Sequence, residues 1–245
     1  MLQRLTKNIL YTSFLIILGA IIGFTATAWA QGTSNQTFVD IVVEPQTYVP
    51  PYYTGRPLPS SGSRVRLVAL VEEPGVIDPS EYRYVWRMGG RVIGGGAIEG
   101  RNTLTIEMPS TRPGQVSVEV ARLGAGIIGR ASTALPTVEP QMVFYPIHPL
   151  YGLENQAITE TMTLTSGSNE LRAAPYYLPL QAFGRTAQTV YNWRINGRAA
   201  PPTDTNQLNI TLQRSQLSNG AAVELEIFNR ANWQQSAQGR IQIEP

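Results

Sequence analysis

The sequence predicts an all-β fold built from two tandem β-sandwich domains. Two segments about a hundred residues apart repeat each other: residues 84–91 read YVWRMGGR and residues 191–198 read YNWRINGR. The same pieces follow each copy, first NTLTI (102–106) against NQLNI (206–210), and then VSVEV (116–120) against VELEI (223–227). Beyond residue 37, apolar residues follow the two-residue period of half-buried strands, and Gly and Pro interrupt them at short intervals. A repeat of this length indicates a duplicated domain.

Residues 1–30 are predicted to be an export signal. Arg4 and Lys7 form a positive start, residues 10–24 are almost wholly apolar, and small residues occupy the two positions that a signal peptidase reads before Gln31. The alternative is an uncleaved signal anchor, because residues 9–30 are long enough to span a bilayer. Either way, we expect the rest of the chain to be periplasmic, at the cell surface or secreted. Residues 31–37 are expected to be a polar leader.

The charge balance limits the kinds of partner to expect, and the absence of cysteine limits how the fold can be stabilised. Removing Arg4 and Lys7 from the 19 basic residues leaves 17, which balances the 17 acidic residues. With no basic cluster, we expect no nucleic-acid partner, and contact with a membrane only through residues 9–30 if the signal stays attached. An exported chain without disulfides must be held together by its hydrophobic cores, and each repeat is large enough for that.

The first domain is expected over residues 38–140. Its strands place alternate residues on an apolar face, and a last strand is expected at 134–140, where it runs into a short, stiff junction. The predicted inward residues are Val65, Leu67, Ala69, Val71, Tyr82, Tyr84, Trp86, Leu104, Ile106, Met108, Val116, Val118 and Val120.

The second domain is expected over residues 141–245, on the same plan. Residues 190–195 carry its tryptophan strand, and Asn196-Gly197 predicts a two-residue hairpin turn because both residues tolerate positive φ. The later inward residues are Leu208, Ile210, Leu212, Val223, Leu225, Ile227, Ile241 and Ile243.

The tryptophan strands carry a resemblance to a known kind of module. Tyr-x-Trp-x-x-x-Gly occurs at 84–90 and 191–197, and a Leu-x-Ile strand and a Val-x-Val/Ile strand come after it. This pattern resembles the C, E and F strands of bacterial immunoglobulin-like and PKD-like modules, and it covers residues 38–245. Two departures are the missing Gly-Asp-Gly of PKD modules and the missing Cys pair of antibody domains. The resemblance to exported two-domain bacterial proteins implies a spacer, adhesive or polysaccharide-binding role.

Trp86 and Trp193, with Tyr84 and Tyr191, are predicted to be core residues. A Trp on the central strand of a sandwich fills the space between its sheets. A role in stacking on a ligand would require the two indole rings to be exposed.

Two clusters of tyrosine and proline are the candidate ligand platform. Tyr52 and Tyr53 lie in YVPPYY (48–53), and Tyr176 and Tyr177 lie in PYYLP (175–179). Such rings can offer a surface to sugars or to a Pro-rich peptide. Alternatively, they cover sheet edges and the interdomain junction while the prolines block edge pairing. Trp233 is a weaker candidate of the same kind.

We identify no catalytic residue, cofactor or metal site. His148, the only histidine, is expected at a turn or an interface, and calcium binding by the acidic loop at 72–81 stays open. The expected function is therefore that of a non-catalytic structural or adhesive protein of the cell envelope, with envelope or surface proteins as partners. The alternative is a polysaccharide-binding module that uses the four tyrosines of the platform, and an enzyme is the third possibility.

Overall fold

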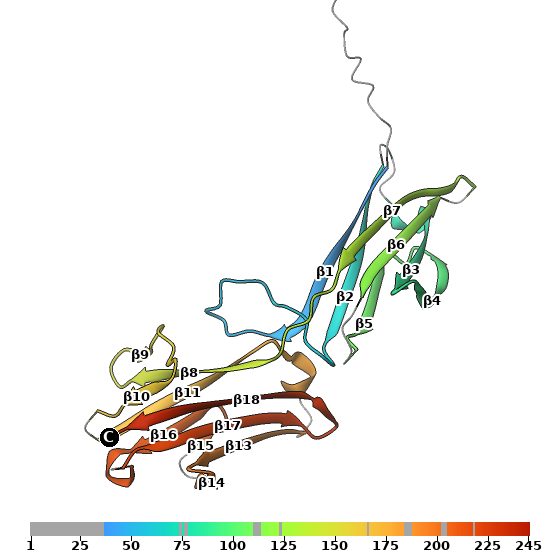
Figure 1. Cartoon of the computed structure of the whole chain (residues 1–245). Coiled ribbons are helices and arrows are strands. Elements are labelled where there is room, and N and C mark those ends of the chain that lie inside the picture. The colour runs from blue at the N-terminus through green and yellow to red at the C-terminus, as the bar shows by residue number, and fades with distance from the viewer. Residues whose placement is uncertain are drawn as a thin grey trace, which may run out of the picture. The chain divides into compact units, whose positions relative to one another are not determined.

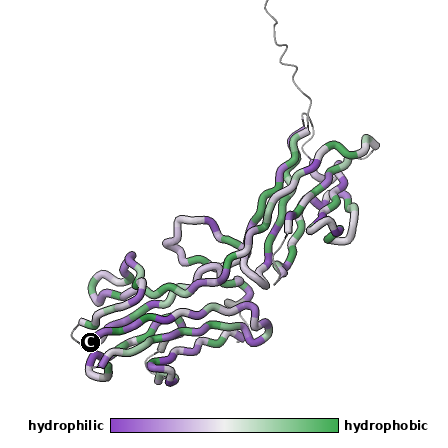
Figure 2. The backbone as a smooth tube through the Cα atoms, in the orientation of Figure 1, coloured by the Kyte–Doolittle hydropathy of each residue, from purple (hydrophilic) through white to green (hydrophobic). Residues whose placement is uncertain are grey.

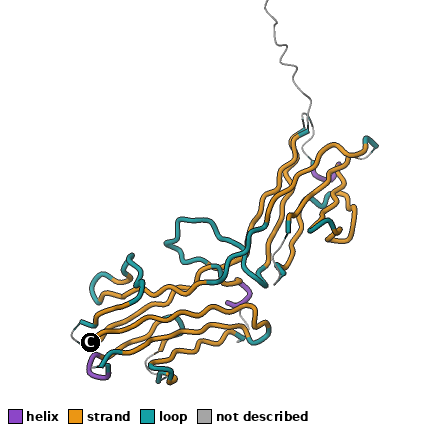
Figure 3. The backbone as a smooth tube through the Cα atoms, viewed as in Figure 1, coloured by secondary structure: helices purple, strands orange, loops and turns teal. Residues whose placement is uncertain are grey.

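The computed structural model describes residues 37–73, 75, 78–109, 114–122, 124–165, 167–183, 188–201, 205–217 and 219–245. The predicted signal segment and nearly all of the predicted leader lie outside these residues. Figure 1 shows the course of the chain, and Figure 3 shows that strands dominate it. In the described residues, helix is limited to single 3-10 turns at Pro79–Glu81, Leu180–Phe183 and Arg214–Gln216. No helix in this part of the chain is long and apolar enough to cross a membrane.

Two sheets form the first sandwich. One sheet has the order β12-β1-β2-β5 and the other has the order β4-β3-β6-β7. Neighbouring strands within both sheets are antiparallel. The strands that follow one another in this part of the chain are β1 (Phe38–Tyr48), β2 (Arg64–Glu72), β3 (Tyr82–Met88), β4 (Arg91–Glu99), β5 (Thr103–Glu107), β6 (Gln115–Arg122) and β7 (Gly126–Ala134).

The second sandwich repeats this arrangement. Its sheets have the orders β15-β16-β11-β8-β9 and β10-β18-β17-β13-β14. The short β10 runs parallel to β18, whereas the other pairs are antiparallel. The strands in this part of the chain, of which β12 alone pairs with the first sandwich, are β8 (Gln141–His148), β9 (Gly152–Leu153), β10 (Thr161–Thr163), β11 (Ser168–Tyr176), β12 (Leu178–Pro179), β13 (Thr189–Ile195), β14 (Arg198–Ala199), β15 (Thr205–Asn206), β16 (Asn209–Gln213), β17 (Ala221–Asn229) and β18 (Asn232–Glu244).

Both sandwiches have an immunoglobulin-like topology. In the first, β2 pairs with β1 and β5 whereas β3 pairs with β6, and in the second, β11 pairs with β8 and β16 whereas β13 pairs with β17, so each chain segment crosses between sheets as in a Greek key. Thus β1, β2 and β5 correspond to β8, β11 and β16, while β3, β6 and β7 correspond to β13, β17 and β18. The predicted all-β class with tandem immunoglobulin-like sandwiches is confirmed.

Each sandwich encloses its own hydrophobic core. Hydrophobic and hydrophilic residues alternate along many strands in Figure 2, as expected for strands with one buried face. The core of the first sandwich extends in sequence from Val39 to Leu135, and that of the second from Phe144 to Ile243. The predicted inward residues on β2, β3 and β6 contribute to the first core, although Val71 is only partly buried.

The two tryptophans occupy equivalent positions in these cores. Trp86 is 1 % exposed and Trp193 is 4 % exposed. The indole Nε1–H of Trp86 donates to the carbonyl oxygen of Arg101 at 3.2 Å, and that of Trp193 donates to the carbonyl oxygen of Gln207 at 2.8 Å. Both acceptors lie two residues before the strand that follows them, β5 or β16. The bond therefore joins one sheet of each sandwich to the start of a strand in the other.

One turn agrees with the prediction and one strand does not. Asn196 and Gly197 have φ values of 50° and 76°, which confirms the hairpin turn with two left-handed residues. The last strand of the first sandwich lies at Gly126–Ala134, so the prediction of a strand over 134–140 was wrong. Pro136 has no N–H to donate to a sheet ladder, and residues 135–140 connect β7 to β8 without pairing as a strand.

The two sandwiches meet through main-chain pairing as well as side chains. Contacts group Thr37–Pro245 as one compact unit. Within it, Thr47 and Tyr48 at the end of β1 pair with Pro179 and Leu178 of β12. Leu178 is fully buried in the core of the second sandwich. The strand that begins the first sandwich therefore ends on a segment anchored in the second.

Replacing Trp193 with Phe tests the indole bond. Trp193→Phe keeps an aromatic ring but removes the donor to Gln207 and leaves a cavity, so we expect the free energy of unfolding to fall by about 1–3 kcal/mol. Urea unfolding of the purified protein measures this change.

The matched control is Trp233→Phe, because Trp233 is 78 % exposed. This substitution should change the free energy of unfolding by less than about 0.5 kcal/mol. Equal losses in the two variants would contradict a structural role for the buried indole.

Candidate functional site

The predicted platform tyrosines gather where β1 meets β12. Tyr52 and Tyr53 come from the loop that follows β1, while Tyr176 ends β11 and Tyr177 precedes β12. The hydroxyl groups of Tyr53 and Tyr177 are 2.8 Å apart and hydrogen-bonded. We call these four residues and Tyr145 of β8 the tyrosine junction. The structure thus brings together two clusters that are more than a hundred residues apart in sequence.

The rings of the tyrosine junction pack edge to face. Tyr52 lies against Tyr145 and Tyr53 against Tyr176, each with a centroid distance of 5.4 Å and interplanar angles of 73° and 86°. Tyr145 and Tyr176 also share a hydrogen bond of 2.8 Å between their hydroxyls. Edge-to-face packing is the favoured geometry of aromatic pairs, but it does not produce one flat shelf. Whether the platform binds a ligand stays a prediction.

The backbone of Tyr177 holds the junction in place. Tyr177 has a φ of 60°, in the left-handed region that non-glycine residues seldom occupy. Its N–H donates to the carbonyl oxygen of Tyr48 at 2.7 Å, and its carbonyl accepts from the Ser60 hydroxyl at 2.6 Å. Both partners belong to the first sandwich, so the left-handed conformation is stabilised across the junction.

A buried glutamine adds a second polar link. Gln235 Nε2 donates to the carbonyl oxygen of Gly62 at 3.1 Å, and Gln235 Oε1 accepts from Asn229 Nδ2 at 2.7 Å. Gln235 is 5 % exposed and Asn229 is 7 % exposed. Buried amides without partners are costly, so this pair restricts how the hairpin between β17 and β18 can sit on the Gly62 turn.

Burial and hydrogen bonding raise the pKa of three phenols in the tyrosine junction. Burial, followed by the influence of Tyr145, raises the pKa of Tyr52 to about 12. Burial raises the pKa of Tyr176 well above its ordinary value, and the hydrogen bond to Tyr145 adds to this effect. The hydrogen bond with Tyr53 raises the pKa of Tyr177, with burial as the second cause. These three phenols therefore keep their protons at a higher pH than a phenol in water does.

The predicted core tyrosines behave differently from each other. Tyr84 is 1 % exposed, and burial raises its pKa to about 12. Tyr191 is only half-buried and packs at the margin of the second core, and burial raises its pKa. Neither phenol belongs to the tyrosine junction.

The acidic loop uses its carboxylates in contacts with its own sandwich. Glu73 accepts from the Tyr82 hydroxyl and from Arg122, both at 2.9 Å, and Glu81 also lies near Arg122. Asp78 caps the 3-10 turn through the N–H of Ser80. Among the described residues, no group of three or more His, Cys, Asp or Glu side chains could hold a metal ion.

His148 organises a tight turn. Its Nδ1 atom accepts from the N–H groups of Leu150 and Tyr151 at 3.1 and 3.3 Å. Its ring stacks on Tyr151 with a centroid distance of 4.6 Å. His148 was expected in a turn; it is the last residue of β8, and the turn follows it at residues 149–151. Trp233 lies 78 % exposed in the strand that follows the β17–β18 turn.

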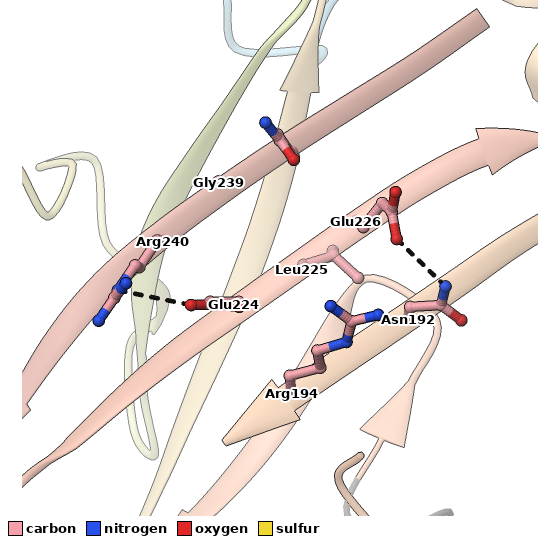
Figure 4. Close-up of a pocket in the computed structure, with 8 residues that line it drawn as sticks. Asn192, Arg194, Glu224, Leu225, Glu226, Gly239 and Arg240 are labelled. Carbon is pink, nitrogen blue, oxygen red and sulfur yellow. Dashed lines mark hydrogen bonds and ion pairs between the residues drawn. The ribbon is translucent and has the colours of Figure 1, made fainter. Parts of the chain in front are cut away.

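The outer faces of the β3-β6-β7 and β13-β17-β18 sheets carry charged residues that the sequence analysis did not single out. In the second sandwich, Arg240 pairs with Glu224 at 3.5 Å and Asn192 donates to Glu226 at 3.3 Å, beside Arg194 (Figure 4). An open depression of about 430 Å³ lies among these residues.

The corresponding face of the first sandwich has the same character. Glu119 lies between Arg130 at 2.9 Å and Arg87 at 3.9 Å, next to a depression of about 360 Å³. The arginines directly after Trp86 and Trp193 were a usable signal, because they must point away from the core. Such solvent-exposed ion pairs contribute little to stability.

The comparisons with known proteins give structural likenesses alone. No protein-family model matches the chain, and no curated protein matches it in sequence. Its structure is similar to the three N-terminal domains of the bacteriophage RB49 Highly Immunogenic Outer Capsid protein, with 16 % identity and a TM-score of 0.46. That alignment covers 84 % of this chain and 58 % of the capsid protein structure, so the chain spans less than two thirds of that length.

Two further similar structures are those of Sidekick-1 and of Drosophila OTK. Sidekick-1 immunoglobulin domains 1–4 share 14 % identity with a TM-score of 0.27, and cover 82 % of this chain and 76 % of theirs. Drosophila OTK extracellular domains 3–5 share 10 % identity with a TM-score of 0.25, and cover 82 % and 97 %. The strand order described above, and not these likenesses, shows that both sandwiches have an immunoglobulin-like fold.

Alkaline unfolding tests the tyrosine junction. Tyrosines of an unfolded chain ionise near pH 10, whereas the folded chain holds several phenolic protons up to about pH 12. Unfolding therefore releases protons in this window, so the free energy of unfolding should fall as the pH rises from about 10 towards 12. In Tyr176→Phe the fall should be smaller, since one such proton is absent.

The measurement is urea unfolding at a series of pH values, with Tyr151→Phe as the matched control because that ring is 84 % exposed. At pH 7, Tyr176→Phe should also lose about 0.5–1.5 kcal/mol through the missing bond to Tyr145. Identical pH profiles for wild type and Tyr176→Phe would refute the contribution of the junction.

Proposed function

We propose that this chain is a non-catalytic structural or adhesive protein of the cell envelope. The observation that carries the proposal is the tyrosine junction, together with the pairing of β1 and β12. Main-chain bonds, paired hydroxyls and a buried amide join the two sandwiches. A hinge would need a connection with few buried contacts, so this junction suits a spacer that holds two binding modules in a constant relation.

The proposed location rests on the sequence of the first thirty residues. A positive start, an apolar run and small residues before Gln31 are typical of an export signal. Envelope or surface proteins are the proposed partners. The exposed outer faces of the sheets and the loops between strands are the parts of the molecule that could bind them.

Fractionation of the producing cells tests the proposal. We expect the chain in the envelope or the medium, and its N-terminus shows whether the signal was removed at Gln31 or residues 1–30 remain as an anchor. Retention of the chain in the cytoplasm would rule out the envelope role. A hydrolase turnover that is lost on substitution of Glu73 or Glu81 would instead rule out a non-catalytic role.

A second candidate is polysaccharide binding by the tyrosine junction. Tyr52 favours it, because its ring is 42 % exposed at the edge of the junction, next to the buried Tyr145. Stacking on a sugar needs an accessible ring, so Tyr52→Ala should abolish any signal on a glycan array without unfolding the protein. A signal that Tyr52→Ala leaves unchanged, or no signal at all, would remove this candidate.

A further inference from the structure

The most exposed large apolar side chains lie at the tip of the β8–β9 hairpin. Leu150 is 82 % exposed and Tyr151 is 84 % exposed. The His148 bonds described above hold both residues in one turn, which the pairing of His148 with Gly152 closes. We call residues 148–152 the hairpin tip. Nothing in the described part of the chain covers the hairpin tip. Its hydrogen bonds nevertheless fix its conformation, and apolar residues that are exposed but already ordered are typical of a binding site.

In the first sandwich, the loop that corresponds to the hairpin tip packs on the neighbouring domain. The hairpin tip belongs to the connection between β8 and β11, which corresponds to the connection between β1 and β2. That first connection carries Tyr52 and Tyr53 onto the outer face of β8 and β11. One copy of the repeat thus shows what this connection can bind, and the other copy leaves it free.

The outer face of β8 and β11, on which the β1–β2 connection packs, has an uncovered equivalent in the first sandwich. Tyr52 and Tyr53 contact Tyr145 on β8 and Tyr176 on β11. The strand register shows which residues are equivalent: Gln141 pairs with Tyr176 in the second sandwich, as Phe38 pairs with Glu72 in the first. The equivalent surface therefore lies at the start of β1 and the end of β2.

Two close contacts support this alignment of β1 with β8. A side chain added at Gly129 of β7 would meet Val39, and one added at Gly239 of β18 would meet Met142. Val39 and Met142 therefore hold equivalent positions, one residue after Phe38 and Gln141 respectively.

The free counterpart in the first sandwich is apolar and exposed. Phe38 is 59 % exposed, Leu70 is 45 % exposed and Val42 is 37 % exposed. All three belong to the outer face of β1 and β2, where Val42 lies opposite Val68 and Leu70 lies opposite Asp40. We call Phe38, Val42, Val68 and Leu70 the receiving face.

We propose that the hairpin tip of one molecule docks on the receiving face of a second copy of this chain, as the β1–β2 connection docks on the second sandwich within each molecule. The contact joins two different surfaces, so it is a head-to-tail contact that can repeat into an open chain of molecules. It goes beyond the proposed function and does not depend on where the protein resides.

Charge makes a second copy a better partner than a lipid surface. Residues 141–165 contain no Lys or Arg, and Glu154 lies beside the hairpin, where its N–H donates to the carbonyl oxygen of Pro146. Binding to an anionic bilayer relies on basic residues. Charged residues of both signs border the receiving face: Asp40 and Glu72 are acidic, and Arg66 on the same face pairs with Glu44.

Cysteine crosslinking between two copies tests the proposal directly. The chain contains no cysteine, so each introduced thiol is unique. One full-length copy carries Tyr151→Cys and a differently tagged full-length copy carries Leu70→Cys, and a short bismaleimide is added to cells that make both. We expect a dimer that contains both tags. The control pairs Leu70→Cys with Trp233→Cys, whose position is 78 % exposed, and should give no such dimer.

Further variants separate the possible outcomes. Adding Leu150→Ser to the Tyr151→Cys copy should lower the dimer yield about tenfold, as expected for the loss of a hot-spot residue. His148→Ala should also lower it, whereas His148→Asn should restore part of it because an Asn oxygen can accept from the same N–H groups.

Three results would overturn the proposal. These are no dimer with both tags, a dimer that Leu150→Ser leaves unchanged, or a dominant product joining two Tyr151→Cys copies. Cell fractionation tests the location of the protein independently of crosslinking. A negative crosslinking result would therefore leave the proposed envelope role intact.

Discussion

The bond between the buried indole and a backbone carbonyl is the constraint on which each sandwich depends. A Trp ring at the centre of a sandwich brings an N–H group with it, and an unpaired donor there would cost about 1–3 kcal/mol. Arg101 and Gln207 supply the carbonyls, and in the second sandwich Gln207 adopts a left-handed φ of 48° to do so. The strand that follows each acceptor begins two residues later, so the indole also sets where β5 and β16 start. The Ala69 and Ala173 N–H groups then bond to the next carbonyl in each copy, at 2.7 Å in both.

At the junction between the sandwiches, hydrogen bonds offset an unfavourable backbone conformation at Tyr177. A left-handed tyrosine costs about 1–2 kcal/mol relative to ordinary backbone. Bonds from its N–H and carbonyl to the first sandwich offset this cost, and the turn directs its ring to Tyr53. Because these bonds cross the junction, separating the sandwiches would leave Tyr177 strained and its polar groups without these partners. This coupling explains why a short Pro-bearing connection can join two modules in one compact unit.

Features set by residues close together in the sequence could be predicted, whereas contacts between distant segments could not. Alternation along β2, β3 and β6 is local, so the inward residues of these strands could be identified, and Asn196-Gly197 marks its turn through the backbone preferences of two adjacent residues. The pairing of Tyr53 with Tyr177 spans 124 residues and leaves no periodic signal. The last strand of the first sandwich was misplaced because Gly126 and Gly129 interrupt its apolar pattern, although Gly129 is needed where β7 approaches Val39. The hydrogen bonds of His148 depend on the orientation of its ring, which residue type alone does not reveal.

The duplication accounts for both what is shared and what differs. Strand order and the indole bond recur in each copy because both stabilise the fold, and the loss of the bond in either copy would destabilise it. The connection between the first two long strands carries no such condition, so the copies could diverge there. In the first copy it supplies Tyr52 and Tyr53 to a domain junction, and in the second it displays Leu150 and Tyr151 on a rigid turn. A connection that is free to vary in sequence, yet is ordered and apolar in both copies, is better explained by binding than by folding. The connection therefore forms a joint between domains in the first copy and an interaction surface in the second.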